Sequence, residues 1–296
     1  MGAWWRSMRQ KRGLSVLLTC LAWSSQAQTL DLPPRAPDAP NGEEFAKLIA
    51  PLPPPPDPQR ENLIYTQVAA GNVPNWMRKL ALISTSEAIA GTNHTVKYYV
   101  TPDYLCVGSD TNYLLEPMTP TLAQRVANLL HCSLPTRKMS QTIWEQAEVK
   151  LTPAPIPPSP AMVTVPIFCQ HNSNVWAQRQ ALLEAHPLGA LVAGHKKDVV
   201  ISALMLTHFH KSRAPVVIYG WQQTNGAPIQ PLYNGHAQTW ADYSHGIRLV
   251  QEIMTVDGVP TTVSAILTNP ALAALLSDET NFPGNTIPRP YYLVPP

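Results

Sequence analysis

The stretch "APVVIYGW", residues 214–221, is apolar almost throughout and rich in Val and Ile over the length of one strand. That composition is typical of a strand buried on both faces. Similar runs flank it: "GALVAG" (189–194), "DVVISALML" (198–206) and "GIRLVQEIMTV" (246–256). Asp257-Gly258 predicts a tight turn into the next apolar run, and therefore one antiparallel pair. We expect these segments to form a central mixed or antiparallel sheet.

Helical spacing dominates the N-terminal half instead. Thr119 and Pro120 supply an N-cap and a first-turn proline before apolar residues at helical spacing, and Thr136 can cap a second helix. Further helices are predicted at "ENLIYTQVAAGN" (61–72), at residues 174–184 and at "NPALAALLSDE" (269–279). The pattern predicts an α+β fold, with a sheet from the C-terminal half packed by helices mainly from the N-terminal half.

The first 27 residues have the three-part layout of a secretory signal peptide. Basic residues between positions 6 and 12 precede an apolar segment from about Gly13 to Trp23, and a small-residue cleavage site ends at Ala27. We therefore expect a secreted or periplasmic protein. Lipid anchoring at Cys20 is the alternative. No other segment is apolar over the length that a bilayer requires, so no integral membrane segment is expected after signal removal.

Proline, at 32 of 296 residues, is concentrated in two clusters. Residues 28–60 contain "LPPRAPDAP" and "APLPPPPDP", which favour polyproline geometry and predict a leader outside the core. The second cluster, "LTPAPIPPSPAM" at residues 151–162, predicts a surface strap within a single domain that covers residues 61–296. Charged residues make up only 14% of the chain and the net charge is +2, without a long basic run after the signal peptide. Nucleic acid is therefore not an expected partner.

The stretch "NGHAQTWADYSHGIRLV", residues 234–250, gathers groups for acid–base chemistry before an apolar run. His236, Asp242, Ser244 and His245 would lie at the entrance of a strand, where a rigid sheet can hold them at the edge of a cleft. A His/Asp pair beside a serine can transfer protons. The two histidines and the aspartate could instead ligate a divalent metal such as Zn²⁺. A polar turn that only caps backbone groups is the competing interpretation.

The segment "AGHKKDVVI" carries a second group of charges between two apolar runs. His195 and Asp198 could take part in proton transfer, and Lys196 and Lys197 could hold an anionic part of a substrate. A solvated turn is the alternative. Arg248, at the end of the first stretch, could bind a carboxylate or phosphate. We expect both segments to lie at the same edge of the sheet.

Three cysteines, Cys106, Cys132 and Cys169, remain after signal removal, so at most one intramolecular disulfide can form. Cys169 and His171 stand just before the helix predicted at residues 174–184. A helix N-terminus lowers the pKa of a thiol, which predicts a cysteine hydrolase as a further possibility. In the hydrolase hypothesis His171 contributes to substrate binding.

Other histidines and aromatic residues allow both functional and structural interpretations. His208 and His210 have the spacing that places two metal ligands on one face of a strand, but no third ligand is evident nearby, which favours an exposed loop. Tyr219 and Trp221 could line a groove for a sugar or peptide. The same two side chains could instead close the core.

Several segments, among them "GNVPNWMRKL", "AGHKKDVV" and "DYSHGIRLV", resemble an uncharacterised family of secreted bacterial proteins over about residues 60–280. This resemblance implies no activity. A narrower likeness is to the active-site segment of L,D-transpeptidases. The matching positions are Ser244, His245, Gly246 and Arg248. Ile247 stands where that family has its nucleophilic cysteine, and Tyr219 replaces its upstream histidine.

Taken together, these features predict a secreted hydrolase that acts on a cell-envelope or extracellular polymer. His245, His236 and Asp242 would transfer protons or ligate a metal, which requires them to lie within about 10 Å of one another. The alternative is a non-catalytic envelope or matrix-binding protein, favoured by the proline-rich leader and by the lack of a complete catalytic motif. Both hypotheses give the protein a polymer or a small molecule as its partner.

Overall fold

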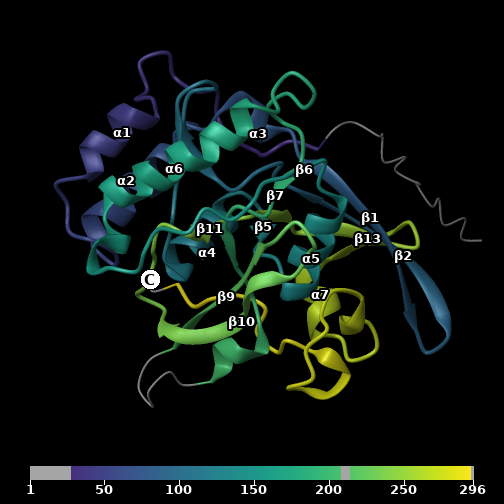
Figure 1. Ribbon diagram of the computed structural model, residues 1–296. Coiled ribbons are helices and arrows are strands. Elements are labelled where there is room, and N and C mark those ends of the chain that lie inside the picture. The colour runs from purple at the N-terminus through teal and green to yellow at the C-terminus, as the bar shows by residue number, and fades with distance from the viewer. Residues whose placement is uncertain (1–27, 208–213, 295–296) are drawn as a thin grey trace, which may run out of the picture.

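The computed structural model describes residues 28–207 and 214–294 (Figure 1). Most of the strands in these ranges belong to two sheets. The larger sheet contains β1 (Ala81–Ile89), β2 (Thr92–Val100), β5 (Cys132–Ser133), β12 (Val250–Gln251), β13 (Ile253–Val256) and β14 (Val259–Thr262). The smaller contains β8 (Lys197–Val199), β9 (Pro215–Gln222), β10 (Pro228–Ala237) and β11 (His245–Gly246). The predicted signal peptide, Cys20, His208 and His210 lie outside the described residues.

The larger sheet is antiparallel, in the order β14-β13-β2-β12-β5, with β1 also paired to β2. The smaller has the order β10-β9-β8-β11, and only its β8–β11 pair is parallel. Short pairs join β3 (Cys106–Gly108) to β4 (Tyr113–Leu115), and β6 (Val149–Lys150) to β7 (Val192–Ala193). Every residue of β9 is buried, as its apolar sequence predicts.

The helices are α1 (Gly42–Ile49), α2 (Pro58–Ala69), α3 (Asn75–Arg78), α4 (Pro120–Leu129), α5 (Arg137–Gln146), α6 (Val165–Gln180) and α7 (Val263–Thr268). The α+β class is confirmed. Strands are spread more widely than the sequence predicted, because the long β1–β2 hairpin comes from the N-terminal half. Within the described ranges, no helix combines the length and the apolar character needed to cross a bilayer.

Local capping signals fixed two helices as predicted. The Thr119 hydroxyl accepts a hydrogen bond from the backbone nitrogen of Leu122, with Pro120 in the first turn of α4. The Thr136 hydroxyl accepts from the backbone nitrogen of Met139 at the start of α5. The Asp257-Gly258 turn also forms, since it joins β13 to β14 as an antiparallel hairpin.

Residues 28–60 are not a leader outside the core. Phe45 and Ile49, four residues apart on one face of α1, are fully buried in the main core, and Leu30 is buried with them. Asn41 begins α1 with a capping box, its side chain accepting from the backbone of Glu44 while the Glu44 carboxylate accepts from the backbone of Asn41. Proline shapes the segment, but the apolar residues between the prolines anchor it.

Two helix boundaries also differ from the prediction. The helix expected at residues 174–184 is α6, and it begins at Val165 because Pro166 occupies its first turn. Asn269 does not begin a helix over residues 269–279 but ends α7, which starts where the Thr262 hydroxyl accepts from the backbone nitrogen of Ala265. The true starts depend on Pro166 and Thr262, which lie N-terminal to the predicted starts.

The strap, residues 151–162, lies on the surface and carries no helix or strand before Pro160. Its Ile156 and Met162 pack against a small apolar cluster separate from the main core. The Tyr243 hydroxyl accepts from the backbone nitrogen of Ile156 at 2.8 Å and donates to the Ile156 carbonyl at 3.1 Å. The strap is therefore tied to the segment that leads into β11.

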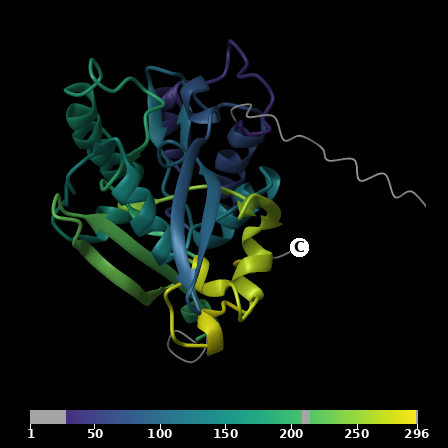
Figure 2. The same cartoon turned by 90° about the vertical axis from the view of Figure 1, so that its right-hand side faces the viewer.

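The β1–β2 hairpin projects from the body (Figures 1 and 2). Along the outer edge of β1, the Gln146 side chain of α5 makes the hydrogen bonds that a neighbouring strand would make to Ser84. Its Oε1 accepts from the Ser84 backbone nitrogen at 3.3 Å, and its Nε2 donates to the Ser84 carbonyl at 3.0 Å.

Replacing Phe45 with alanine should lower the free energy of unfolding by about 3–5 kcal/mol, because the ring is fully buried. Leu48 of the same helix is 54% exposed, and its replacement with alanine should change stability by no more than about 0.5 kcal/mol. Urea denaturation followed by circular dichroism measures both. Equally small effects would show that α1 lies outside the cooperatively folding body.

Candidate functional site

The parallel pairing of β11 with β8 brings together the two titratable segments predicted from the sequence. His245 lies opposite Lys197, and Gly246 lies opposite Asp198. A side chain at Gly246 would not fit, since its Cβ would lie 2.5 Å from the Tyr104 ring. The expectation that both segments share one edge of the sheet is therefore met, and glycine makes the close approach possible.

Asp242 is the charged centre of the first segment. Its Oδ1 accepts from the Ser244 backbone nitrogen at 2.8 Å and from the Ser244 hydroxyl at 2.5 Å, and its Oδ2 accepts from Trp240 Nε1 at 3.1 Å. His245 Nε2 lies 3.9 Å from Oδ2. Burial raises the pKa of Asp242, but His245, Lys197 and the Ser244 hydrogen bonds outweigh it and hold the pKa at about 2. The carboxylate is therefore charged at neutral pH.

The histidines around Asp242 are mainly neutral. His245 is fully buried, and burial lowers its pKa to about 4. His236 is half-buried, with its ring stacked on Trp240 at a centroid distance of 5.1 Å, and burial also lowers its pKa. A neutral imidazole has a free acceptor nitrogen, so both side chains can receive a proton.

A second histidine–carboxylate pair joins the bend before β8 to the bend after β2. Nε2 of His195 is 3.0 Å from Oδ1 of Asp103, at an angle outside hydrogen-bond geometry. Burial raises the pKa of Asp103, but the charge of His195 and other contacts lower it below its usual value. The Tyr104 hydroxyl donates to Asp198 at 3.1 Å, and burial raises the pKa of Asp198 to about 6. Sequence reasoning missed Asp103, whose one signal is the break after Pro102 between two apolar runs.

The two lysines differ in position. Lys196 is buried, and its Nζ donates to the Tyr243 carbonyl at 2.6 Å. Burial lowers its pKa to about 8. Lys197 is half-buried, with its ammonium 4.9 Å from the centre of the Trp221 ring, and burial lowers its pKa as well. Of the two, Lys197 is nearer the surface.

Three predicted binding residues have structural partners instead. Arg248 donates to the backbone carbonyls of Thr101 and Val192. It therefore joins distant segments of the chain and does not present a free guanidinium to a carboxylate or phosphate. Trp221 Nε1 donates to the His195 carbonyl and Tyr219 donates to Gln141. Both aromatic side chains are buried, Tyr219 in the main core and Trp221 in the small apolar cluster, so neither lines a groove.

The structure does not support Cys169 as a nucleophile. Cys169 and His171 lie inside α6 rather than before its first turn, and burial raises the pKa of the thiol. Cys106, Cys132 and Cys169 are all free thiols. His171 is fully buried, 5.0 Å from the Tyr243 ring, and burial lowers its pKa to about 2.

The predicted metal site also finds no support. Among the residues that the structure describes, no group of three His, Cys, Asp or Glu side chains is placed to hold a metal ion. His236, His245 and Asp242 all lie within the described ranges. Their arrangement fits proton transfer better than metal ligation.

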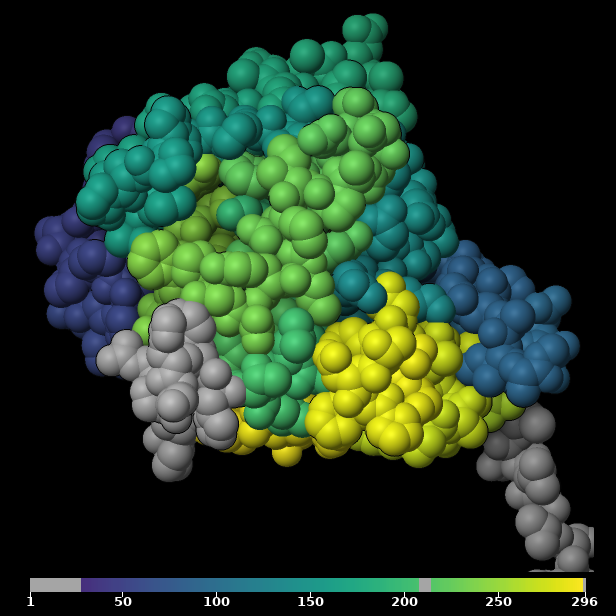
Figure 3. Space-filling view, turned by 60° about the horizontal axis from the view of Figure 1, so that its bottom comes forward, coloured from purple at the N-terminus to yellow at the C-terminus, as the bar shows by residue number. Residues whose placement is uncertain are grey.

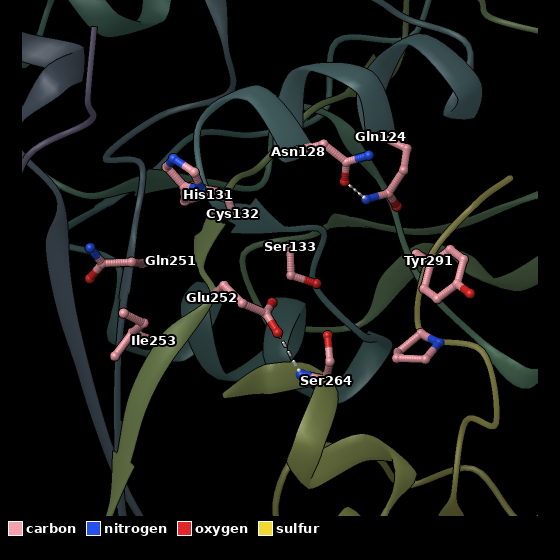
Figure 4. A pocket seen from close by; sticks show the side chains of 11 residues that line it. Gln124, Asn128, His131, Cys132, Ser133, Gln251, Glu252, Ile253, Ser264 and Tyr291 are labelled. Atoms are coloured by element: carbon pink, nitrogen blue, oxygen red, sulfur yellow. Dashed lines mark hydrogen bonds between the residues drawn. The ribbon is translucent and has the colours of Figure 1, made fainter. Parts of the chain in front are cut away.

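The surface is hollowed on the face seen in Figure 3, between the teal segment of about residues 150–180 and the green segments of about residues 215–245. A different cavity, of about 470 Å³, opens between α4, β12 and the C-terminal tail (Figure 4). There Glu252, Ser133 and Ser264 point toward one another, and Ser264 donates its backbone N–H to Glu252. No residue predicted from the sequence as part of the site lines this second cavity.

Acidification should destabilise the protein through His245. Its pKa is 6.5 in the unfolded chain and about 4 when folded, so between these values only the unfolded chain binds the proton. Stability therefore falls as the pH drops from 6.5 to 4, by up to about 1.4 kcal/mol per pH unit for such a group. Chemical denaturation at several pH values should show a flatter dependence for His245→Asn, although the contribution of His171 remains.

The matched control is His131→Asn, because His131 is exposed and has a positive φ that asparagine tolerates. Its pH dependence should match that of the unaltered protein. An unchanged slope in His245→Asn would contradict the buried neutral state of this imidazole.

Ile247, at the position of the transpeptidase cysteine, is fully buried. The local likeness to that segment, and the resemblance to secreted bacterial proteins, stay predictions, and the site is defined by its own contacts. No family model, curated protein or solved structure matches this chain.

Proposed function

We propose that the protein is a secreted hydrolase that acts on a cell-envelope or extracellular polymer by general acid–base catalysis. The observation that carries this proposal is the position of Asp242. Its carboxylate binds Ser244 and Trp240 and lies beside His245, and its charge also acts on His236 and Lys197. One charged carboxylate with two neutral imidazoles and an ammonium nearby provides the acid and base groups that proton transfer requires.

In the proposed reaction, a neutral imidazole accepts a proton from water as the water oxygen bonds to the electrophilic centre of the substrate. The scissile bond then breaks, and the imidazolium returns its proton to the leaving group. Asp242 stabilises the imidazolium from the uptake of the proton until its return. His236 is the histidine nearer the surface, and His245 lies directly against Asp242 on the inner side. Ser244 donates its hydroxyl proton to Asp242 rather than to a histidine, so it orients the carboxylate and does not act as a nucleophile.

Replacing Asp242 with asparagine should reduce hydrolysis by about 10²–10⁴-fold, because the imidazolium loses its counter-charge. Asp257→Asn is the matched control: Asp257 is exposed at the β13–β14 turn, and asparagine tolerates its positive φ. Release of soluble fragments from dye-labelled peptidoglycan and polysaccharides measures both. Hydrolysis that survives in Asp242→Asn, or that is absent from the unaltered mature protein on every polymer, would contradict the proposal.

The non-catalytic alternative has one observation in its favour. His236 stacks on Trp240 and meets the Tyr233 ring edge-on at a centroid distance of 5.4 Å, which forms a partly exposed aromatic row. Such rings bind sugars or peptides without catalysis. Polymer pull-down without fragment release, lost in Trp240→Ala and kept in Asp242→Asn, would favour this alternative.

A further inference from the structure

Several buried ionisable side chains in the described part of the chain carry polar atoms without a hydrogen-bond partner. Among these atoms are Nε and Nη2 of Arg60, both carboxylate oxygens of Glu116 and both ring nitrogens of His171. The three residues are at most 1% exposed. Buried polar atoms are nearly always paired in folded proteins, so several unpaired ones in one region indicate a place built for a polar ligand.

These side chains come from separate segments of the chain. The ring of Tyr243 lies 5.0 Å from the ring of His171, and the Tyr243 carbonyl accepts a hydrogen bond from Lys196 Nζ at 2.6 Å. The charge of Glu116 acts on Arg60 and on Lys196, and the charge of Lys196 acts on His171. The Arg60 guanidinium lies 4.9 Å from the centre of the Phe168 ring, on the same helix as His171. Within the part of the chain that the structure describes, neither Arg60 nor Lys196 comes within 4.0 Å of a Glu116 oxygen. The opposite charges face one another without closing into an ion pair.

The two unpaired nitrogens of Arg60 indicate the chemical class of the ligand. Nε and Nη2 lie on one edge of the guanidinium and present two parallel N–H donors, the geometry that binds a carboxylate or phosphate with two hydrogen bonds. Lys196 adds a positive charge, and the neutral His171 ring adds one further donor. The aromatic rings of Phe168 and Tyr243 border the same region.

We propose that Arg60, His171 and Lys196 bind an oxyanion, a carboxylate or a phosphate group. That this group belongs to the polymer on which the protein acts rests on the proposed function, whereas the binding of the anion does not. Glu116 tunes the site, since the ionised carboxylate repels an anion and the protonated form can donate a hydrogen bond to it.

The first test titrates acetate and inorganic phosphate, at constant ionic strength and pH 6.5, into the mature protein with ¹⁵N-labelled arginine. The Arg60 Nε–H resonance should shift. Arg60→Lys keeps the charge and loses the two-pronged geometry, so affinity measured by calorimetry should fall about tenfold or more. Arg125→Lys, a change at an arginine stacked on Tyr65, should leave the affinity unchanged. The stronger of the two probes identifies the class of oxyanion.

A second variant, Glu116→Gln, should strengthen anion binding where Arg60→Lys weakens it. Burial raises the pKa of Glu116 to about 7, with the charges of Arg60 and Lys196 opposing it, so acetate should bind more weakly as the pH rises from 6 to 8. Lys196, which faces Glu116, Asp242 and Asp103, loses its proton near pH 8 and adds to the loss. Glu116→Gln should bind acetate about tenfold more tightly than the unaltered protein at pH 8 and nearly equally at pH 6.

The proposal is overturned if neither anion shifts the Arg60 resonance, if Arg60→Lys binds as the unaltered protein does, or if Glu116→Gln weakens binding at pH 8. These outcomes are separate from the fate of the proposed function. Anion binding through Arg60 with no hydrolysis of any polymer would leave this inference intact and remove the hydrolase. Hydrolysis that depends on Asp242 but has the same KM in Arg60→Lys would keep the hydrolase and show that the bound anion is not part of its polymer.

Discussion

The pairing of β11 with β8 is the contact on which the rest of the site depends. It has only two residue pairs, but it places His245 and Asp242 beside the segment that carries His195, Lys196 and Asp198. Gly246 makes it possible by leaving room for the Tyr104 ring. The approach adds the positive charge of Lys197 to the hydrogen bonds that Asp242 receives from its own segment. Packing and electrostatics therefore constrain the same short strand.

Charge is scarce in this chain and much of it lies inside. The interior sorts the groups into different protonation states: Asp242 stays charged, His245 and His171 stay neutral, and Glu116 has a pKa near neutral pH. Burial shifts all four of these pKa values in the direction of the neutral form, and of the four only Asp242 has enough opposite charge and hydrogen bonding to resist it, as Asp103 does elsewhere. Groups with different pKa values in one place provide the proton donor and the proton acceptor that acid–base chemistry requires.

What the sequence predicts well is decided within a few residues. The caps at Thr119 and Thr136 and the Asp257-Gly258 turn depend only on their neighbours, and the structure confirms them. Phe45 in the core, and Arg60 and Asp103 near the site, escaped prediction because their partners lie far along the chain. The periodicity of an apolar run cannot indicate which distant charge it will face. The α+β class followed from the apolar runs, whereas β1 and its pairing with β2 did not.

The contact between Gln146 and Ser84 has a consequence for molecules that meet in solution. An outer strand of nine residues with free backbone groups invites a second copy to add its own strand, the first step toward fibres. Here a side-chain amide already occupies the donor and acceptor of Ser84, near the middle of that strand. An incoming strand would have to displace Gln146 of α5 to form hydrogen bonds along all of β1. The Gln146 side chain therefore hinders strand addition at this edge.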